Sequence, residues 1–459
     1  MSRKETGRLS ENVTINKLTR GAIIAIAAVM LLLPFNKAYA GIPVGTWRAH
    51  PSYNDATFSL KAFGYICVLS DGALYLYDPA DNGLYTIDKT GGLADTDIAA
   101  LGYCQPEKAV VLVYSNGNID LLYEDFSIYN FTDIKNNSTG NVTVNQLNIS
   151  GNNAYISTNI GLIVFDVKRK EISNTYRFET QVYTSVILND SIICATQGGM
   201  YLGILSDNLL DNSKWKLFRN ITFRRLFEFD GQLTGYSFDN RIWTVNRANA
   251  GLSLVKDKVS SMSLLSDNRL ALIQDTAVTI FSSLSEQTQY TFPHHVNHIM
   301  TDGNDLWVCH GLNGLYQYST DDDRLVLKAR DIKPDSPRRN WFHSVSWPQP
   351  GKLMVVSGCH NYFGIDYPGT VMIYENDRWT YLVEDIQSKT NLKYINLTEA
   401  AQDPSDPNHI FVGSAGQGLY EFRNNKFEKL YTWNNSALKS ILNNTEFNKN
   451  NYVRISALQ

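Results

Sequence analysis

Three histidines that lie close together, His294, His295 and His298, come nearest to a metal site in this sequence. Imidazole nitrogens bind zinc and copper, and histidines a few residues apart can share one divalent ion. If this segment is a strand, alternation puts His294 and His298 on one face and His295 on the other. No acidic or cysteine ligand lies near them in the sequence. We therefore favour a polar connection between strands, and we predict no metal and no cofactor.

The sequence lacks the short motifs that mark common catalytic sites. It has no G-x-S-x-G, H-E-x-x-H, P-loop or sialidase Asp-box, and no G-H…W-D blade signature. Carboxylates from distant segments can still meet in a fold and act as a pair. A hydrolase or lyase therefore stays open as an alternative, but we predict a protein that is not an enzyme.

Polar residues at one recurring kind of turn are the candidate ligand-binding residues. Amides and carboxylates beside tyrosines can hydrogen-bond to sugars, but Asn, Asp and Gly also simply favour tight turns. Both interpretations stay open. The candidates are Asp71, Asn116, Asn159, Gln197, Asp239, His310 and Asn313.

A second candidate is the basic and aromatic cluster of Arg338, Arg339 and Trp341, with His343 close by. Guanidinium groups bind phosphate well. The segment around them also contains two prolines and several charges, which is typical of a solvated linker. We favour the linker and keep phosphate binding as the alternative.

The candidate turns must be positioned by strands, because the same short pattern recurs along the chain. The glycines that mark it, Gly72, Gly117, Gly161 and Gly199, are 45, 44 and 38 residues apart. A period of about 40–45 residues with β character is typical of propeller blades. Propellers bind through the loops on their faces, so the repeat favours binding over catalysis.

The repeat predicts an all-β fold: a seven-bladed β-propeller over 41–330, then a linker and the start of a second, incomplete β-propeller over 331–459. The segment around Trp47 is expected to pair with the last blade and close the ring, since closure removes an exposed edge. After 340 the sequence supplies two blades and one strand, 452–459. These cannot close a ring, so we expect the protein to continue beyond Gln459.

Composition supports export and argues against nucleic acid as a partner. Residues 1–40 hold six basic and two acidic side chains. They also contain an apolar run after Arg20 and end with Ala38-Tyr39-Ala40. This is typical of a signal peptide, and an uncleaved anchor is the alternative. The remainder has 35 basic and 43 acidic residues, a net charge of −8, whereas nucleic-acid binding needs a basic surface. The five cysteines include no C-x-x-C pair, which excludes a zinc ribbon and a disulfide framework.

The order of several stretches resembles the PorZ family of the type IX secretion system of Gram-negative bacteria. The stretches are 45–50, 90–98, 114–122, 161–166 and 330–335. The resemblance implies a seven-bladed propeller, a second propeller and a C-terminal β-sandwich, and it brings no catalytic residue.

The resemblance also implies a function. Members act at the cell surface with the PorU sortase, PorV and PorQ, bind anionic lipopolysaccharide and present it to the sortase for attachment to cargo. The blade pattern alone is shared with the sensor propellers of hybrid two-component regulators. A periplasmic propeller that senses carbohydrate is therefore the alternative.

Overall fold

The computed structural model describes residues 47–137, 141–321, 324–359, 366–382, 385–440 and 452–458. These residues form nine antiparallel sheets, each of four strands that follow one another in the sequence. The expected signal peptide lies outside the described residues. Within them, no helix is long and apolar enough to cross a membrane.

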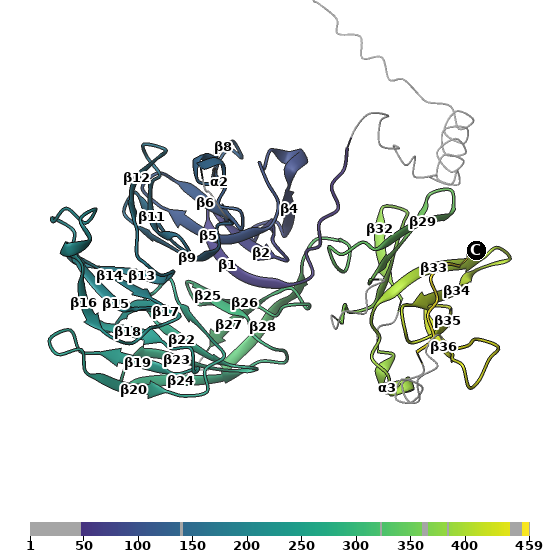
Figure 1. Cartoon of the computed structure of the whole chain (residues 1–459). Coiled ribbons are helices and arrows are strands. Elements are labelled where there is room, and N and C mark those ends of the chain that lie inside the picture. The colour runs from purple at the N-terminus through teal and green to yellow at the C-terminus, as the bar shows by residue number, and fades with distance from the viewer. Residues whose placement is uncertain are drawn as a thin grey trace, which may run out of the picture. The chain divides into compact units, whose positions relative to one another are not determined.

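The first seven sheets are the blades of the N-terminal ring (Figure 1). The strands of blades 1 to 4 are β1 (Ala56–Ala62), β2 (Tyr65–Ser70), β3 (Ala73–Asp78), β4 (Gly83–Ile87), β5 (Ile98–Cys104), β6 (Ala109–Tyr114), β7 (Ile119–Tyr123), β8 (Ile128–Phe131), β9 (Val144–Ser150), β10 (Asn153–Thr158), β11 (Gly161–Asp166), β12 (Glu171–Tyr176), β13 (Val182–Leu188), β14 (Ser191–Thr196), β15 (Gly199–Ile204) and β16 (Lys216–Arg219). Those of blades 5 to 7 are β17 (Arg225–Phe229), β18 (Gln232–Tyr236), β19 (Ile242–Val245), β20 (Leu252–Lys256), β21 (Ser261–Leu264), β22 (Leu270–Gln274), β23 (Ala277–Ser283), β24 (Glu286–Thr291), β25 (His298–Asp302), β26 (Asp305–Cys309), β27 (Leu315–Asp321) and β28 (Arg324–Ile332).

Two further blades follow the ring. Their strands are β29 (Ser344–Gln349), β30 (Lys352–Ser357), β31 (Thr370–Glu375), β32 (Arg378–Tyr381), β33 (Leu397–Asp403), β34 (Asp406–Ser414), β35 (Leu419–Arg423) and β36 (Lys426–Tyr431). The short helices of the described residues are η1 (Lys89–Gly91), α2 (Asp133–Asn137), η2 (Asn212–Lys214) and α3 (Gln387–Thr390). The predicted all-β fold, a seven-bladed propeller followed by the first blades of a second, is confirmed.

Seven separate apolar cores hold the ring together, one at each boundary between neighbouring blades. The core between blades 7 and 1 contains Tyr75 and Tyr77 from β3 with Trp307 from β26. Because each core takes side chains from two blades, no blade buries its apolar faces alone. Cys67, Cys194 and Cys309 are buried free thiols in these cores, as expected for small apolar residues.

The ring closes through β1, and not through the segment around Trp47, so that prediction is wrong. Trp47 lies in no strand, and 89% of its surface is exposed. Ala56 instead forms a β-bridge with Gly311. Blade 7 takes all four of its strands from β25 to β28. No strand position is therefore left in blade 7 for the N-terminal segment to fill.

The last described segment, 452–458, lies beside blade 9. Val453 forms a parallel bridge with Gln417, and the Thr398 hydroxyl of β33 donates to the carbonyl of Ile455 at 2.5 Å. Since β33 is the first strand of its blade, 452–458 takes the place expected of the first strand of a further blade.

Candidate functional site

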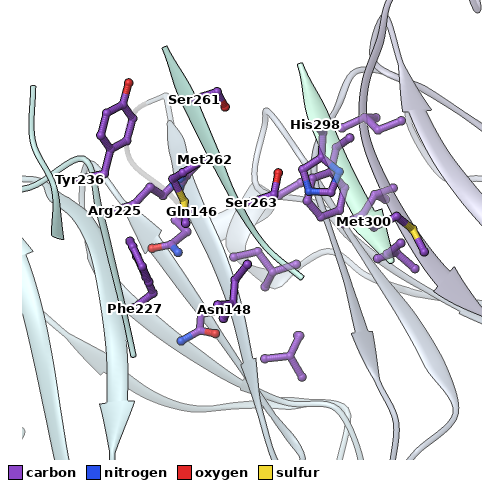
Figure 2. A pocket seen from close by; sticks show the side chains of 18 of the residues that line it. Gln146, Asn148, Arg225, Phe227, Tyr236, Ser261, Met262, Ser263, His298 and Met300 are labelled. Carbon is purple, nitrogen blue, oxygen red and sulfur yellow. The ribbon is translucent and has the colours of Figure 1, made fainter. Parts of the chain in front are cut away.

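The first strands of all seven blades surround a central cavity of about 810 Å³, called here the axial channel. Cavities of this size accommodate small-molecule ligands. Figure 2 shows Gln146, Arg225 and Phe227 on one side of the channel and His298 and Met300 on the other.

Arg225 is the most unusual side chain of the channel wall. It begins β17 of blade 5, and its Nη1 donates to the carbonyl of Asn145 in blade 3 at 2.9 Å. Burial, and then the neighbouring charge of Arg224, lower the pKa of the Arg225 guanidinium. The group still stays protonated, because arginine does not lose its proton in proteins.

The wall of the channel is positively charged although the body of the protein is acidic. The charged residues that line it are Lys61, Arg224, Arg225 and Glu228. Lys61 is neutralised by an ion pair with Asp302, Nζ to Oδ1 2.6 Å. Two positive charges, on Arg224 and Arg225 of blade 5, then stand against the one negative charge of Glu228, and the balance of the wall is positive.

The rim at blade 5 combines this charge with aromatic rings. The Arg224 guanidinium lies 5.2 Å from the ring centre of Tyr236 and 5.3 Å from that of Phe238. Phe238 is 44% exposed and meets Tyr183 edge-on, with centroids 4.8 Å apart. Cation–π contacts of this kind hold a long side chain at the surface in one place.

The three histidines do not converge on one point. The backbone N–H of Ser59 donates to Nδ1 of His298 at 3.3 Å, and burial lowers the pKa of His298 to about 3. His295 Nδ1 lies 2.7 Å from Asp275 Oδ1, whereas His294 packs against Tyr316. Throughout the described ranges, no group of three or more His, Cys, Asp or Glu side chains is arranged to hold a metal ion.

Two of the predicted turn residues hold structure together, Asp239 within its own turn and Asn159 between its turn and the segment 141–143. Asn159 accepts from the backbone N–H of Thr143 at 2.8 Å and donates to the carbonyl of Asn141 at 2.9 Å. Asp239 pairs with Arg241 at 3.0 Å. The Asp239 contact is that expected of a residue that closes a turn, whereas Asn159 ties its turn to the segment that precedes β9.

Two other turn residues contact neighbouring segments. Asp71 accepts from the Asn340 amide at 3.0 Å, and the Asn116 amide donates to Asp95 at 2.6 Å. Gln197 is exposed. None of the seven predicted turn residues belongs to the axial channel, so the structure does not gather them around the cavity, and their binding role stays a prediction.

His310 and Asn313 belong to the turn of blade 7. His310 is 2% exposed, its Nδ1 lies 2.9 Å from the carbonyl of His295, and its Nε2 lies 3.3 Å from the Tyr318 hydroxyl. Asn313 donates its backbone N–H to the carbonyl of His310 at 3.1 Å. His310 therefore supports the turn from inside and does not face solvent.

The buried position of His310 predicts a loss of stability in mild acid. Burial lowers its pKa from 6.5 to about 4. Between these values the unfolded chain binds a proton that the folded chain does not, so stability falls as the pH falls from about 6.5 to 4. We expect His310→Gln to lose less stability over this range than the unchanged protein, measured as urea midpoints at several pH values. Equal losses in the two proteins, or protonation of His310 near pH 6.5 by NMR, would contradict this.

The predicted basic cluster is divided among different contacts. The Arg339 Nε donates to the Thr370 hydroxyl at 3.2 Å, and the carbonyl of Arg338 accepts from the Ser52 hydroxyl at 3.3 Å. Trp341 is 51% exposed. The segment is held to its neighbours more closely than a solvated linker, and phosphate binding there stays a prediction.

The sequence interpretation did not single out Arg225 or Gln146. The only available signal was the pair Arg224-Arg225 at the start of a strand whose other residues are apolar except Glu228. Neither the repeat nor any short motif indicates which residues of a first strand line the axis.

Comparison with known proteins supports the fold. Residues 66–216 match the family model for the N-terminal β-propeller domain of PorZ of the type IX secretion system. This part of the chain is therefore similar to the N-terminal propeller domain of PorZ. A solved structure of PorZ from Porphyromonas gingivalis, described as an essential bacterial surface component of that system, matches with a TM-score of 0.78 and 24% identity. The match covers 89% of this chain and 55% of that PorZ chain, so this chain spans about half of it.

Two other solved propellers also match this chain. The extracellular domain of a hybrid two-component system from B. thetaiotaomicron matches with a TM-score of 0.48 and 13% identity, over 86% of this chain and 61% of that one. The WD40 propeller of Doa1 matches with a TM-score of 0.47 and 14% identity, over 60% of this chain and 95% of that one. No curated protein matches the sequence.

Proposed function

We propose that this protein is a non-enzymatic component of the type IX secretion system, exported to the cell surface. It would bind anionic lipopolysaccharide and present it to the PorU sortase for attachment to cargo, together with PorV and PorQ. The match of residues 66–216 to the PorZ propeller model is the observation that supports this most. The absence of catalytic motifs from the sequence agrees with a binding role.

Deletion of the gene, with complementation by the full-length gene, tests the proposal. We expect the deletion to abolish surface attachment of cargo and complementation to restore it. Pull-down with the tagged protein should recover the sortase, and purified anionic lipopolysaccharide should bind more tightly than a neutral form. The proposal fails if deletion leaves secretion and attachment intact and the protein binds neither sortase nor lipopolysaccharide.

A further inference from the structure

The axial channel contains a cation without a counter-charge. Over the described part of the chain, no carboxylate lies within ion-pair distance of Arg225, and its one hydrogen bond goes to the Asn145 carbonyl. Glu228 lines the same channel three residues further along β17, but it forms no ion pair with Arg225 in the described structure. A buried charge is costly unless an opposite charge or several hydrogen bonds compensate it.

An unpartnered acceptor belongs to the same channel. The Oε1 atom of Gln146 is buried and has no hydrogen-bond partner in the described structure. Gln146 adjoins Asn145, which accepts the Arg225 hydrogen bond, so the guanidinium and this part of β9 meet in the channel. A buried acceptor without a donor destabilises the folded state.

The two groups together define the chemistry of a ligand. A guanidinium has five N–H donors in a planar fork that fits a carboxylate or a phosphate, and only one nitrogen of Arg225 has a protein partner. The Gln146 oxygen requires a donor, which a hydroxyl supplies. An acidic sugar unit carries both groups, and a cavity of about 810 Å³ has room for it.

We propose that the axial channel binds an acidic sugar unit, whose carboxylate or phosphate pairs with Arg225 while a hydroxyl donates to Gln146. Identifying that unit as part of lipopolysaccharide rests on the proposed function, but binding in the channel does not. The positive wall also explains how a body with a net charge of −8 can take up an anion: the positive potential is confined to one cavity.

Titration of the complete protein with glucuronate, glucose 6-phosphate and neutral glucose tests the proposal by calorimetry. We expect both acids to bind and glucose to bind at least about tenfold more weakly. Arg225→Gln, which can still donate to the Asn145 carbonyl, should weaken binding of the acids about tenfold or more. Arg169→Gln is the matched control, because Arg169 is 67% exposed and pairs with Glu171 outside the channel.

A second variant keeps the test valid if Arg225→Gln fails to fold. Gln146→Leu should weaken binding of glucuronate several-fold and leave binding of sulfate unchanged, since the sugar supplies a hydroxyl donor and sulfate has none at neutral pH. The proposal is overturned if neither acid binds the unchanged protein, or if a folded Arg225 variant binds both acids normally.

Complementation by the Arg225→Gln gene separates this inference from the proposed function. If the variant loses acid binding but restores cargo attachment, the channel is a site for another acidic sugar and the link to lipopolysaccharide fails. If deletion of the gene has no effect on attachment, the proposed function fails, whereas the binding result stands.

Discussion

Replacement of Trp307 by alanine is expected to lower the free energy of unfolding by roughly 3–5 kcal/mol. Trp307 is 1% exposed and lies in the core between blades 7 and 1, where its ring centroid is 5.6 Å from that of Tyr77. This core joins blade 7 to blade 1, the last and first blades of the ring. Removal of the indole would leave a cavity at the boundary where the ring closes. Urea unfolding followed by circular dichroism measures the change.

Trp347→Ala is the matched control for this prediction. Trp347 is 71% exposed, so its loss removes little buried area, and substitutions at such positions usually change stability by about 0.5 kcal/mol or less. Equal urea midpoints for the two variants would show that the boundary between blades 7 and 1 does not hold the ring closed.

Gly161→Ala is expected to cost roughly 3 kcal/mol or more, since backbone strain and overpacking each cost about 1–3 kcal/mol. Gly161 has a φ of +134°, and a Cβ there would lie 2.4 Å from the carbonyl oxygen of Tyr176. Tyr176 pairs with Leu162, so this carbonyl cannot move away without disturbing the pairing of β11 with β12. The variant should show a lower urea midpoint.

Gly151→Ala separates strain from overpacking. Gly151 also has a positive φ, +58°, but no atom lies within 4 Å of a Cβ built there. Its replacement should cost about 1–2 kcal/mol, the penalty of the left-handed conformation alone. If Gly161→Ala proved no more costly than Gly151→Ala, the close approach to Tyr176 would have no energetic role.

The repeat of marker glycines has a physical basis that the structure supplies. Gly199 and Gly418 have φ values of +123° and +110°, and a Cβ on either would meet a carbonyl oxygen, that of Arg219 or Tyr431, at 2.8 or 2.2 Å. In each blade concerned, the start of the third strand passes close to the end of the fourth. Only glycine fits there, whereas a Cβ on the marker glycines Gly72 and Gly117 would meet Asp97 and Ile134 instead.

Closure of the ring could not be predicted from the same pattern. The N-terminal segment around Trp47 was expected to complete the last blade, but β25 to β28 complete it alone. The strand β28 runs from Arg324 to Ile332 and alternates weakly, with mostly exposed side chains. A strand at the outer edge of a blade buries little apolar surface. Its sequence therefore alternates too weakly to predict a strand.

In the candidate site too, local preferences predicted turn residues but not the residues that line the channel. Asp239 does pair within its own turn, as the preference of Asp for turns predicts. Arg225 and Gln146 come from β17 and β9 of different blades, 79 positions apart in the sequence. Their meeting in the channel depends on the curvature of the whole ring.

The sequence by itself determined the β fold, the blades and the turns, because alternation of side chains and the need for glycine act over a few neighbouring residues. The tertiary structure alone decided how the ring closes, which turn side chains are buried, and that two arginines of blade 5 form the positive part of the axial channel. These properties depend on which strands become neighbours across the ring, and the short-range preferences of single residues do not specify that.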